Sequence, residues 1–247
     1  MKKREDLKIL LMQIREDDKV KEEELTSFAD HAGIHKSQIK IHDVFKNPQF
    51  GASILNGFDA LFVGGASEAS VLEPKKYLFV ESLKDLLVHA VKIDLPVFAS
   101  CFGFQIAVLA FGGKIIRDTE NFEMGTYPMT LTEHAQLDPV FNNIPNYFHA
   151  ISVHQEKAID LPEHCLLMAY TKDCIHSFRY EGKNFWAFQF HPELDRPRLT
   201  ERLNAYKDKY TEDIDHFNSI IDHLADTPNA NKLVSNFIDY ILSFKSL

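Results

Sequence analysis

LPVFASCFGFQIAVLAFGG, residues 95–113, is the stretch that decides the fold. Its first part, Pro96–Ser100, is rich in β-branched and aromatic residues and predicts a buried strand. Its second part is an apolar run closed by a pair of glycines, which predicts a helix. Cys101 stands at the junction, with the small residues Ala99 and Gly103 two positions away on either side. This pattern predicts a nucleophile elbow, a strained strand-to-helix turn that exposes one reactive side chain.

A helix that begins at Cys101 favours reactivity of the cysteine. The N-terminus of a helix carries unpaired N–H groups and a partial positive charge, which favour thiolate over thiol. The same N–H groups would receive a developing oxyanion. For a lone cysteine in an apolar run, however, a small buried core residue is the ordinary interpretation. A second stretch is needed to decide between the two.

That second stretch is FWAFQFHPE, residues 185–193. It predicts another strand, whose polar end carries His191 and Glu193. A thiol nucleophile needs a general base, and the base needs a carboxylate to orient it. Because open α/β sheets place their sites at the carboxyl ends of strands, we expect Cys101, His191 and Glu193 to meet there as catalytic residues.

Cys101-Phe-Gly-Phe-Gln105 and His191-Pro-Glu193 together resemble the class I, triad-type glutamine amidotransferases, which take ammonia from glutamine. The resemblance covers residues 7–195 and is closest to stand-alone GMP-synthase-like amidotransferases and the related plant γ-glutamyl peptidases. It implies cysteine-dependent hydrolysis of the γ-amide of glutamine, or of a γ-glutamyl compound, through a γ-glutamyl thioester. It implies no cofactor and no metal.

The resemblance also assigns an oxyanion hole. The predicted third strand ends in Gly64-Gly65-Ala66-Ser67, where the family usually has G-G-P-x-S and uses a backbone N–H as an oxyanion donor. This chain keeps the glycines and lacks the proline. We therefore expect the N–H groups of Gly65 and Phe102 to form the oxyanion hole, with an altered loop shape.

Residues 151–156, ISVHQE, are similar to the S-H-G-D segment that binds substrate glutamine in the family. The similarity implies that Val153, His154 and Gln155 bind substrate, together with Gln105 on the first turn of the elbow helix, and that Glu156 replaces the acid. The match is partial, because a glutamine stands where glycine is usual. An ordinary strand with one histidine is the alternative.

The order of elements predicts the fold. Strands and helices alternate up to residue 113, which favours a parallel sheet with crossover helices. Aromatic strands follow between residues 122 and 190, one of them unbroken over 147–158, and favour hairpins. We expect an α/β fold with a Rossmann-like (flavodoxin-like), mostly parallel sheet flanked by helices and a small antiparallel extension. One domain, 1–247, would comprise a core (7–195) and a C-terminal helical extension (196–247).

In that extension, Thr227-Pro228 predicts a helix start, and apolar residues repeat at helical spacing over 233–242. We expect this stripe to pack against the sheet; a homodimer or partner surface is the alternative. Nearer the N-terminus, the acidic run 22–24 predicts a solvated helix face. His31 and His35 have the spacing of metal ligands, but a glycine lies between them and no third ligand is near, so no metal is expected.

Composition limits the partners. The net charge of −9, with no basic stripe to offset it, argues against nucleic acid, and no apolar stretch approaches membrane-spanning length. Three cysteines without CxxC spacing favour a reducing compartment, the cytoplasm. The expected partners are a small-molecule substrate and a separate synthetase subunit that receives the ammonia, unless the protein hydrolyses γ-glutamyl compounds alone. A non-catalytic or redox relative is the rival interpretation, which the intact His-Pro-Glu disfavours.

Overall fold

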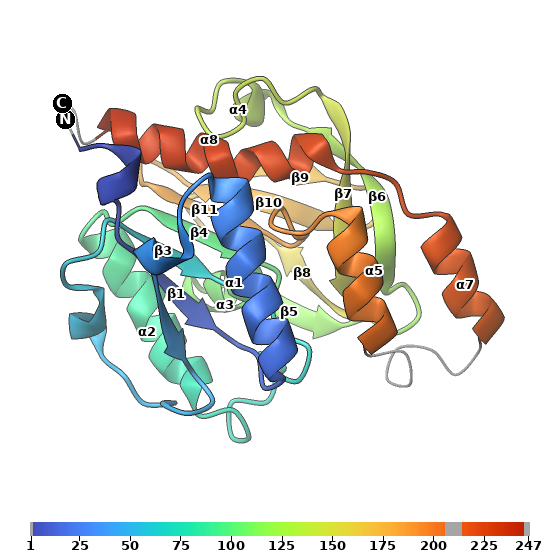
Figure 1. Cartoon of the computed structure of the whole chain (residues 1–247), viewed down its shortest axis with the longest axis horizontal. Helices are drawn as coiled ribbons and strands as arrows, with labels where there is room; N and C mark the ends of the chain where they lie inside the picture. Colours follow the sequence, from blue (N-terminus) through green and yellow to red (C-terminus); the bar gives the residue numbers. More distant parts are fainter. Residues whose placement is uncertain (1, 206–213, 245–247) are drawn as a thin grey trace.

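The computed structural model of the chain describes residues 2–205 and 214–244. A nine-stranded sheet runs through its centre in the order β2-β1-β3-β4-β11-β10-β9-β6-β7, and β5 and β8 form a second, two-stranded sheet (Figure 1). The strands are β1 (Ile9–Gln13), β2 (Ile39–Asp43), β3 (Ala60–Val63), β4 (Val97–Ser100), β5 (Lys114–Arg117), β6 (Glu123–Leu131), β7 (Tyr147–His154), β8 (Glu156–Asp160), β9 (Cys165–Tyr170), β10 (Ile175–Tyr180) and β11 (Phe185–Phe188).

Helices pack on both faces of the large sheet. They are α1 (Asp18–Ala32), α2 (Phe79–Lys92), α3 (Phe102–Ala110), α4 (Glu133–Gln136), α5 (Arg196–Ala205), α7 (Ile214–Asp222) and α8 (Pro228–Phe244), with short 3-10 turns η1 (Arg4–Asp6), η2 (Lys36–Gln38) and η3 (Ala52–Leu55). Across the described ranges, no helix has the length and apolar character needed to cross a membrane.

The topology confirms the α/β prediction. Strands β2, β1, β3, β4 and β11 pair in parallel, and the remaining strands of the large sheet pair antiparallel. The antiparallel part is therefore a continuation of the main sheet through β10, β9, β6 and β7. The predicted hairpin between β10 and β11 is present.

One strand prediction is wrong. The segment 147–158 is two strands, because β7 ends at His154 and β8 begins at Glu156. Exposed Gln155 lies at the break, and its carbonyl accepts a hydrogen bond from the N–H of Asp118 at 2.7 Å. β7 stays paired with β6, whereas β8 leaves the sheet and pairs with β5. The turn at this break lies close to the cysteine elbow, since both line the same cavity.

Side chains of each central strand alternate between two cores, because successive residues of a strand point to opposite faces. Ile9 and Leu11 of β1 belong to the cluster that α1 and α8 cover. Leu10 and Met12 belong to the cluster under α2 and α3. The inner parallel strands β1, β3, β4 and β11 are thus buried along their whole length, as the interior of a parallel sheet requires, whereas the edge strand β2 is mostly half-buried.

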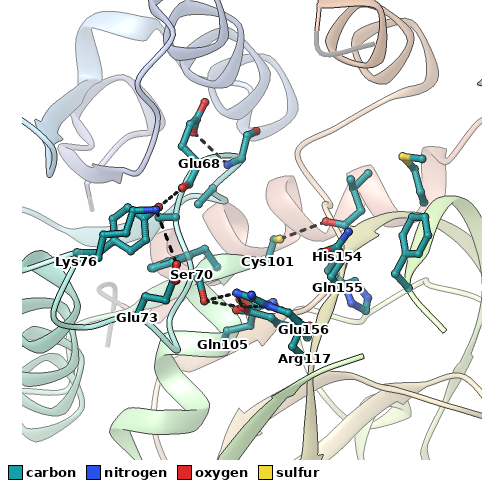
Figure 2. A pocket seen from close by; sticks show the side chains of 18 residues that line it. Glu68, Ser70, Glu73, Lys76, Cys101, Gln105, Arg117, His154, Gln155 and Glu156 are labelled. Atoms are coloured by element: carbon teal, nitrogen blue, oxygen red, sulfur yellow. Dashed lines mark hydrogen bonds and ion pairs between the residues drawn. The ribbon is translucent and has the colours of Figure 1, made fainter. Parts of the chain in front are cut away.

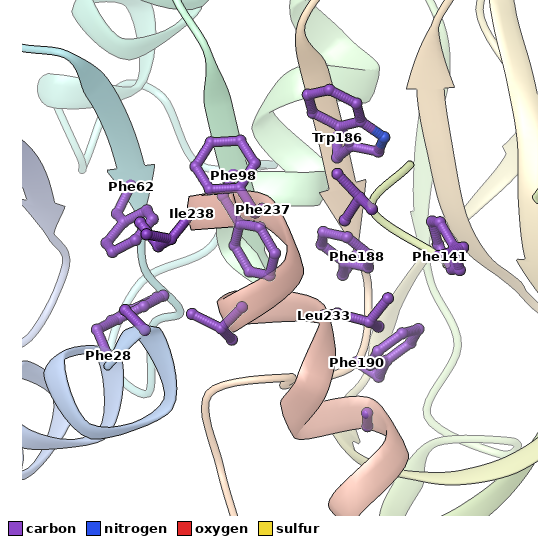
Figure 3. Packing of buried hydrophobic residues seen from close by; sticks show 14 of the residues in the cluster. Phe28, Phe62, Phe98, Phe141, Trp186, Phe188, Phe190, Leu233, Phe237 and Ile238 are labelled. Atoms are coloured by element: carbon purple, nitrogen blue, oxygen red, sulfur yellow. The ribbon is translucent and has the colours of Figure 1, made fainter. Parts of the chain in front are cut away.

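Helix α8 closes the first of these cores (Figure 3). It begins at Pro228, as predicted, and Phe237 lies against Phe62, Phe98 and Trp186 at ring-centroid distances of 6.0, 5.4 and 5.8 Å. Most of its predicted stripe is fully buried: Leu233, Val234, Phe237, Ile238 and Ile241. The prediction that the stripe packs against the sheet is confirmed.

Candidate active site

Cys101 occupies the strained turn that the sequence predicts. It lies between β4 and α3 with φ 51° and ψ −101°, in a region that residues with side chains rarely adopt. Gly103 must be glycine here, since a Cβ on it would lie 2.8 Å from the Val63 carbonyl oxygen and 3.1 Å from the Cβ of Ala99. Phe102 is the first residue of α3, so no carbonyl of the helix accepts its N–H.

His191 and Glu193 form a buried pair just beyond β11. Nδ1 of His191 lies 2.6 Å from Oε1 of Glu193, and both residues are almost fully buried. Burial alone would lower the pKa of His191, but the charges of Glu193 and Cys101 and hydrogen bonds with both raise it to about 9. Burial alone would raise the pKa of Glu193, but His191 keeps it below its usual value. The pair therefore holds an ionised carboxylate and an imidazolium at neutral pH.

Gly65 shows how closely these groups converge. A Cβ built on Gly65 would lie 2.8 Å from Cε1 of His191, 3.4 Å from Cβ of Cys101 and 2.8 Å from Nη2 of Arg15. The three side chains thus surround a single point beside the glycine backbone. The structure brings the predicted nucleophile, base and orienting acid together, with the predicted oxyanion loop against them.

Arg15 is a charged group at this point that sequence reasoning missed. It is 1% exposed, and its Nε donates to Oε1 of Glu24 at 2.9 Å while Nη1 donates to Oγ of Ser67 at 2.9 Å. Burial alone would lower the pKa of Arg15, but the charge and hydrogen bond of Glu24 raise it. Nη2 has no hydrogen-bond partner among the described residues. A buried guanidinium therefore stands beside the cysteine and the Gly64–Gly65 loop.

Glu24 corrects the prediction that residues 22–24 form a solvated face. It is fully buried, and a Cβ on Gly64 would lie 2.6 Å from its Oε1. Val20 and Phe28, four residues on either side, are also buried on α1. This i, i+4 spacing places Glu24 on the apolar stripe, and it is the signal that could have identified the buried carboxylate.

The C-terminal helix holds the loop that carries the His–Glu pair. Nδ2 of Asn231, on the first turn of α8, donates to the carbonyls of Pro192 and Leu194 at 2.8 and 2.7 Å. The hydroxyl of Thr227 also donates to the Leu194 carbonyl, at 3.4 Å. The backbone on both sides of Glu193 is thus tied to α8, a second role that the apolar stripe did not predict.

Cys101 opens into a cavity of about 430 Å³ (Figure 2). Its walls come from the loop between β3 and α2, the start of α3, β5, and the turn between β7 and β8. Acidic and basic side chains both reach it: Glu68, Glu73, Lys76, Arg117 and Glu156. His191 lies outside this lining and faces a much smaller hollow with Arg15 and Arg202. The cysteine is therefore the group that a ligand in the large cavity would meet first.

The predicted substrate-binding residues all line this cavity, but they point differently. The Val153 carbonyl oxygen lies 3.9 Å from Sγ of Cys101, and Nε2 of Gln105 donates to the Glu156 carbonyl at 3.0 Å. Gln155 is exposed. The buried ring of His154 contacts Glu123 on the neighbouring strand β6, with 3.1 Å between Nε2 of His154 and Oε2 of Glu123.

A charged pair borders the same cavity. Nη2 of Arg117 donates to Oε1 of Glu156 at 2.8 Å, and the hydroxyl of Ser70 donates to the same oxygen at 2.5 Å. The Arg117 side chain is 47% exposed, so part of its guanidinium faces the open space. Sequence reasoning missed Arg117, because β5 is a short strand with three exposed residues of four.

His31 and His35 do not share a site. Gly33, at φ 62°, caps α1 after Ala32, so the two histidines are not on one helix face. His31 faces Asp195, with 3.6 Å between Nε2 and Oδ2, whereas Nδ1 of His35 lies 2.7 Å from Oγ of Ser37.

Known proteins share this sequence pattern and fold. The family profile "Glutamine amidotransferase class-I" matches residues 34–203. The GMP synthase [glutamine-hydrolyzing] of Thermotoga maritima is 33% identical over 108 residues, which are 44% of this chain and 20% of that protein. A glutamine-hydrolyzing GMP synthase subunit of Methanocaldococcus jannaschii is 28% identical over 116 residues, 47% of this chain and 60% of that one. The match thus spans only a part of each relative.

Solved structures agree on the fold. A glutamine amidotransferase of Thermotoga maritima superposes with a TM-score of 0.74 at 16% identity, covering 96% of this chain and 98% of that one. The enzyme of the same name from Methylobacillus flagellatus gives a TM-score of 0.72 at 13% identity, over 96% and 95% of the two chains. Because the family profile spans more than half of the chain, this protein belongs to the class-I glutamine amidotransferases.

Proposed function

We propose that the protein hydrolyses the γ-amide of glutamine, or of a γ-glutamyl compound, with Cys101 as nucleophile, His191 as base and Glu193 as the acid that orients it. The observation that carries the proposal is the meeting of a cysteine at positive φ with a buried His–Glu pair around Gly65. A core cysteine needs neither a strained backbone nor a charged pair beside it. A nucleophile at an elbow has both, since the turn exposes it and the pair supplies its base.

The chemistry follows from these positions. Sγ of Cys101 attacks the amide carbon, and the carbonyl oxygen becomes an oxyanion that the N–H groups of Phe102 and Gly65 receive. His191 holds the thiol proton as an imidazolium before the attack and gives it to the departing nitrogen, which leaves as ammonia or an amine. Water, deprotonated by His191, then hydrolyses the γ-glutamyl thioester and frees Cys101. Glu193 keeps the imidazole in the orientation and tautomer that both transfers require.

Arg15 supports this arrangement as a positioning residue. Its guanidinium binds Ser67 and Glu24 on the two sides of the Gly64–Gly65 loop, so it fixes the loop that supplies one oxyanion donor.

The cavity favours a substrate with both charges of an amino acid. The α-carbon end of a γ-glutamyl group carries an ammonium and a carboxylate, and the cavity offers Glu73 and Glu156 for the first and Arg117 and Lys76 for the second. Its volume, about 430 Å³, lies in the range of sites for ligands much larger than free glutamine. We therefore expect a loose fit for glutamine and room for a larger amine.

Two kinds of enzyme fit this site, an amidotransferase that works with a synthetase and a peptidase that works alone. The relative from Methanocaldococcus jannaschii is named as one subunit of its enzyme, so a separate synthetase that docks and receives ammonia is one proposal. The other is a γ-glutamyl peptidase that acts without any synthetase. The three cysteines are all free, which favours a reducing compartment such as the cytoplasm.

The test measures ammonia release from glutamine and amine release from γ-glutamyl dipeptides side by side on the purified chain. Cys101→Ala should abolish both, by about 10³-fold or more, since nucleophile and base act as a unit. Cys165→Ser is the matched control, because Cys165 lies on β9 and does not line the cavity. Activity that persists in Cys101→Ala would contradict the assignment. A wild-type chain inactive on both substrates, even with a synthetase partner, would favour the non-catalytic or redox alternative.

A further inference from the structure

Four side chains of types that bind metals lie together beside the cavity, whose lining includes one of them, His154. They are Glu123 on β6, His154 at the end of β7, Cys174 just before β10 and His176 on β10. One ring nitrogen of each histidine and Sγ of Cys174 all lie within 4.8 Å of one another. Glu123 reaches both rings: its carboxylate oxygens lie 3.1 Å from Nε2 of His154 and 3.3 Å from Nε2 of His176.

The antiparallel half of the sheet creates this cluster. Glu123 is paired directly with His154 in the β6–β7 ladder. Cys174 and His176 lie where the chain returns from β9 into β10, in a turn closed by a hydrogen bond from the N–H of Thr171 to the Cys174 carbonyl at 3.0 Å. The cluster therefore joins three segments of the chain that are distant in sequence.

The donor types fit a zinc-like cation. Zn²⁺ takes imidazole nitrogen, thiolate sulfur and carboxylate oxygen in a tetrahedral set, at bond lengths that place neighbouring ligand atoms roughly 3.3–3.6 Å apart. The two Glu123–histidine separations, 3.1 and 3.3 Å, lie at or just below that range. The ligand atoms of His154, Cys174 and His176 lie within 4.8 Å of one another, so they must close by up to about 1.5 Å to reach that spacing.

The charges and the burial of these four residues also favour a bound divalent cation. All four side chains belong to residues at most 8% exposed. A divalent cation with one thiolate, one carboxylate and two neutral imidazoles is electrically neutral, which a buried site requires. Binding releases the thiol proton of Cys174 to solvent.

A hydrogen-bonded network without metal is the competing explanation. In that network Glu123 accepts from both histidines, and the thiol contributes nothing, since its one hydrogen bond goes to the Ile175 carbonyl at 3.4 Å. Nδ1 of His176 also has no partner among the described residues, although the ring is fully buried. The network leaves the Cys174 thiol without a role, whereas a bound cation would use it as a ligand.

We propose that Glu123, His154, Cys174 and His176 bind one zinc-like divalent cation with a structural role. His154 directly follows Val153, whose carbonyl lies against Cys101, so the ion would brace the wall of the cavity. The site does not depend on the proposed hydrolysis, because its ligands are neither the nucleophile, nor the base, nor the acid that orients it.

The test is a cobalt titration of the metal-depleted full-length chain carrying Cys101→Ala, which removes the reactive cysteine as a competing ligand. Co²⁺ should bind at one equivalent and give the thiolate-to-cobalt absorption band with the visible bands of a tetrahedral site, and Zn²⁺ should displace it. Elemental analysis of the purified wild-type chain should show about one metal per chain, and Zn²⁺ should raise Tm by mass action.

Variants assign the ligands. In the same Cys101→Ala background, Cys174→Ser should abolish the thiolate band, whereas the control Cys165→Ser should keep it. His176→Gln, which retains a hydrogen-bond donor for Glu123, should weaken Co²⁺ binding by about 10-fold or more. The proposal is overturned if the parent chain gives no tetrahedral cobalt spectrum, or if Cys174→Ser leaves that spectrum unchanged. Neither result bears on whether Cys101 hydrolyses amides.

Discussion

Gly65→Ala introduces one methyl group at the point where the reactive side chains converge. The new Cβ would lie 2.8 Å from Cε1 of His191 and 2.8 Å from Nη2 of Arg15. Carbon atoms in contact rest at about 3.5 Å or more, so the imidazole must retreat by about 0.7 Å. A misplacement of about 1 Å at a reacting centre costs on the order of 10²-fold in rate. We expect kcat to fall by about that factor.

Stability should change much less than activity. Overpacking a buried site costs about 1–3 kcal/mol, and Gly65 needs no left-handed backbone that alanine would strain. The control is Gly51→Ala, since a Cβ on Gly51 meets no atom within 4 Å. The two variants are compared by steady-state hydrolysis and thermal unfolding. If Gly65→Ala keeps more than half of the wild-type kcat, His191 is not the base that the geometry indicates.

Three further outcomes are expected. Glu193→Gln should reduce kcat less than His191→Ala. It should also move the alkaline limb of the kcat/KM profile below the wild-type position near pH 9, because His191 loses the neighbouring charge that raises its pKa and so loses its proton at lower pH. An unmoved limb would contradict this electrostatic assignment. Asn231→Ala and Asn236→Ala each remove two side-chain bonds to carbonyls from α8, so both should lower the free energy of unfolding by about 1–3 kcal/mol. Only Asn231→Ala should also lower kcat, by about tenfold, and equal kcat values would show that α8 does not position the His–Glu loop. Finally, kcat/KM of the isolated protein for glutamine should stay below about 10⁴ M⁻¹s⁻¹; a higher value would show that the altered glutamine segment is harmless.

Local pattern was enough to predict the elbow and the parallel sheet. The turn at Cys101 needs small neighbours, and the structure shows the reason, since the Cβ of Ala99 and the carbonyl of Val63 lie where a side chain on Gly103 would go. The inner parallel strands β1, β3, β4 and β11 are short, almost entirely apolar runs, which is typical of strands buried on both faces. Both features depend on residues close together in sequence.

What local pattern missed depends on pairing between distant segments. The chain leaves the large sheet at Gln155, within the predicted long strand, so that β8 pairs with β5, and this brings Arg117 to Glu156. The cluster of Glu123 and His154 likewise exists only once β6 and β7 are in register. Neither pair has a characteristic spacing in the sequence.

The Gly64–Gly65 loop shows how one missing residue is compensated. Family members usually have proline after the two glycines, and proline fixes φ and stiffens a loop. Here Ala66 follows instead, and the hydroxyl oxygen of the next residue, Ser67, accepts a hydrogen bond from Arg15. A buried arginine is costly unless it is paired, and Glu24 pairs with it only because Gly64 leaves room for the carboxylate. The two glycines therefore have different roles, since Gly64 admits the ion pair that restrains the loop and Gly65 admits the groups that carry out the proposed reaction.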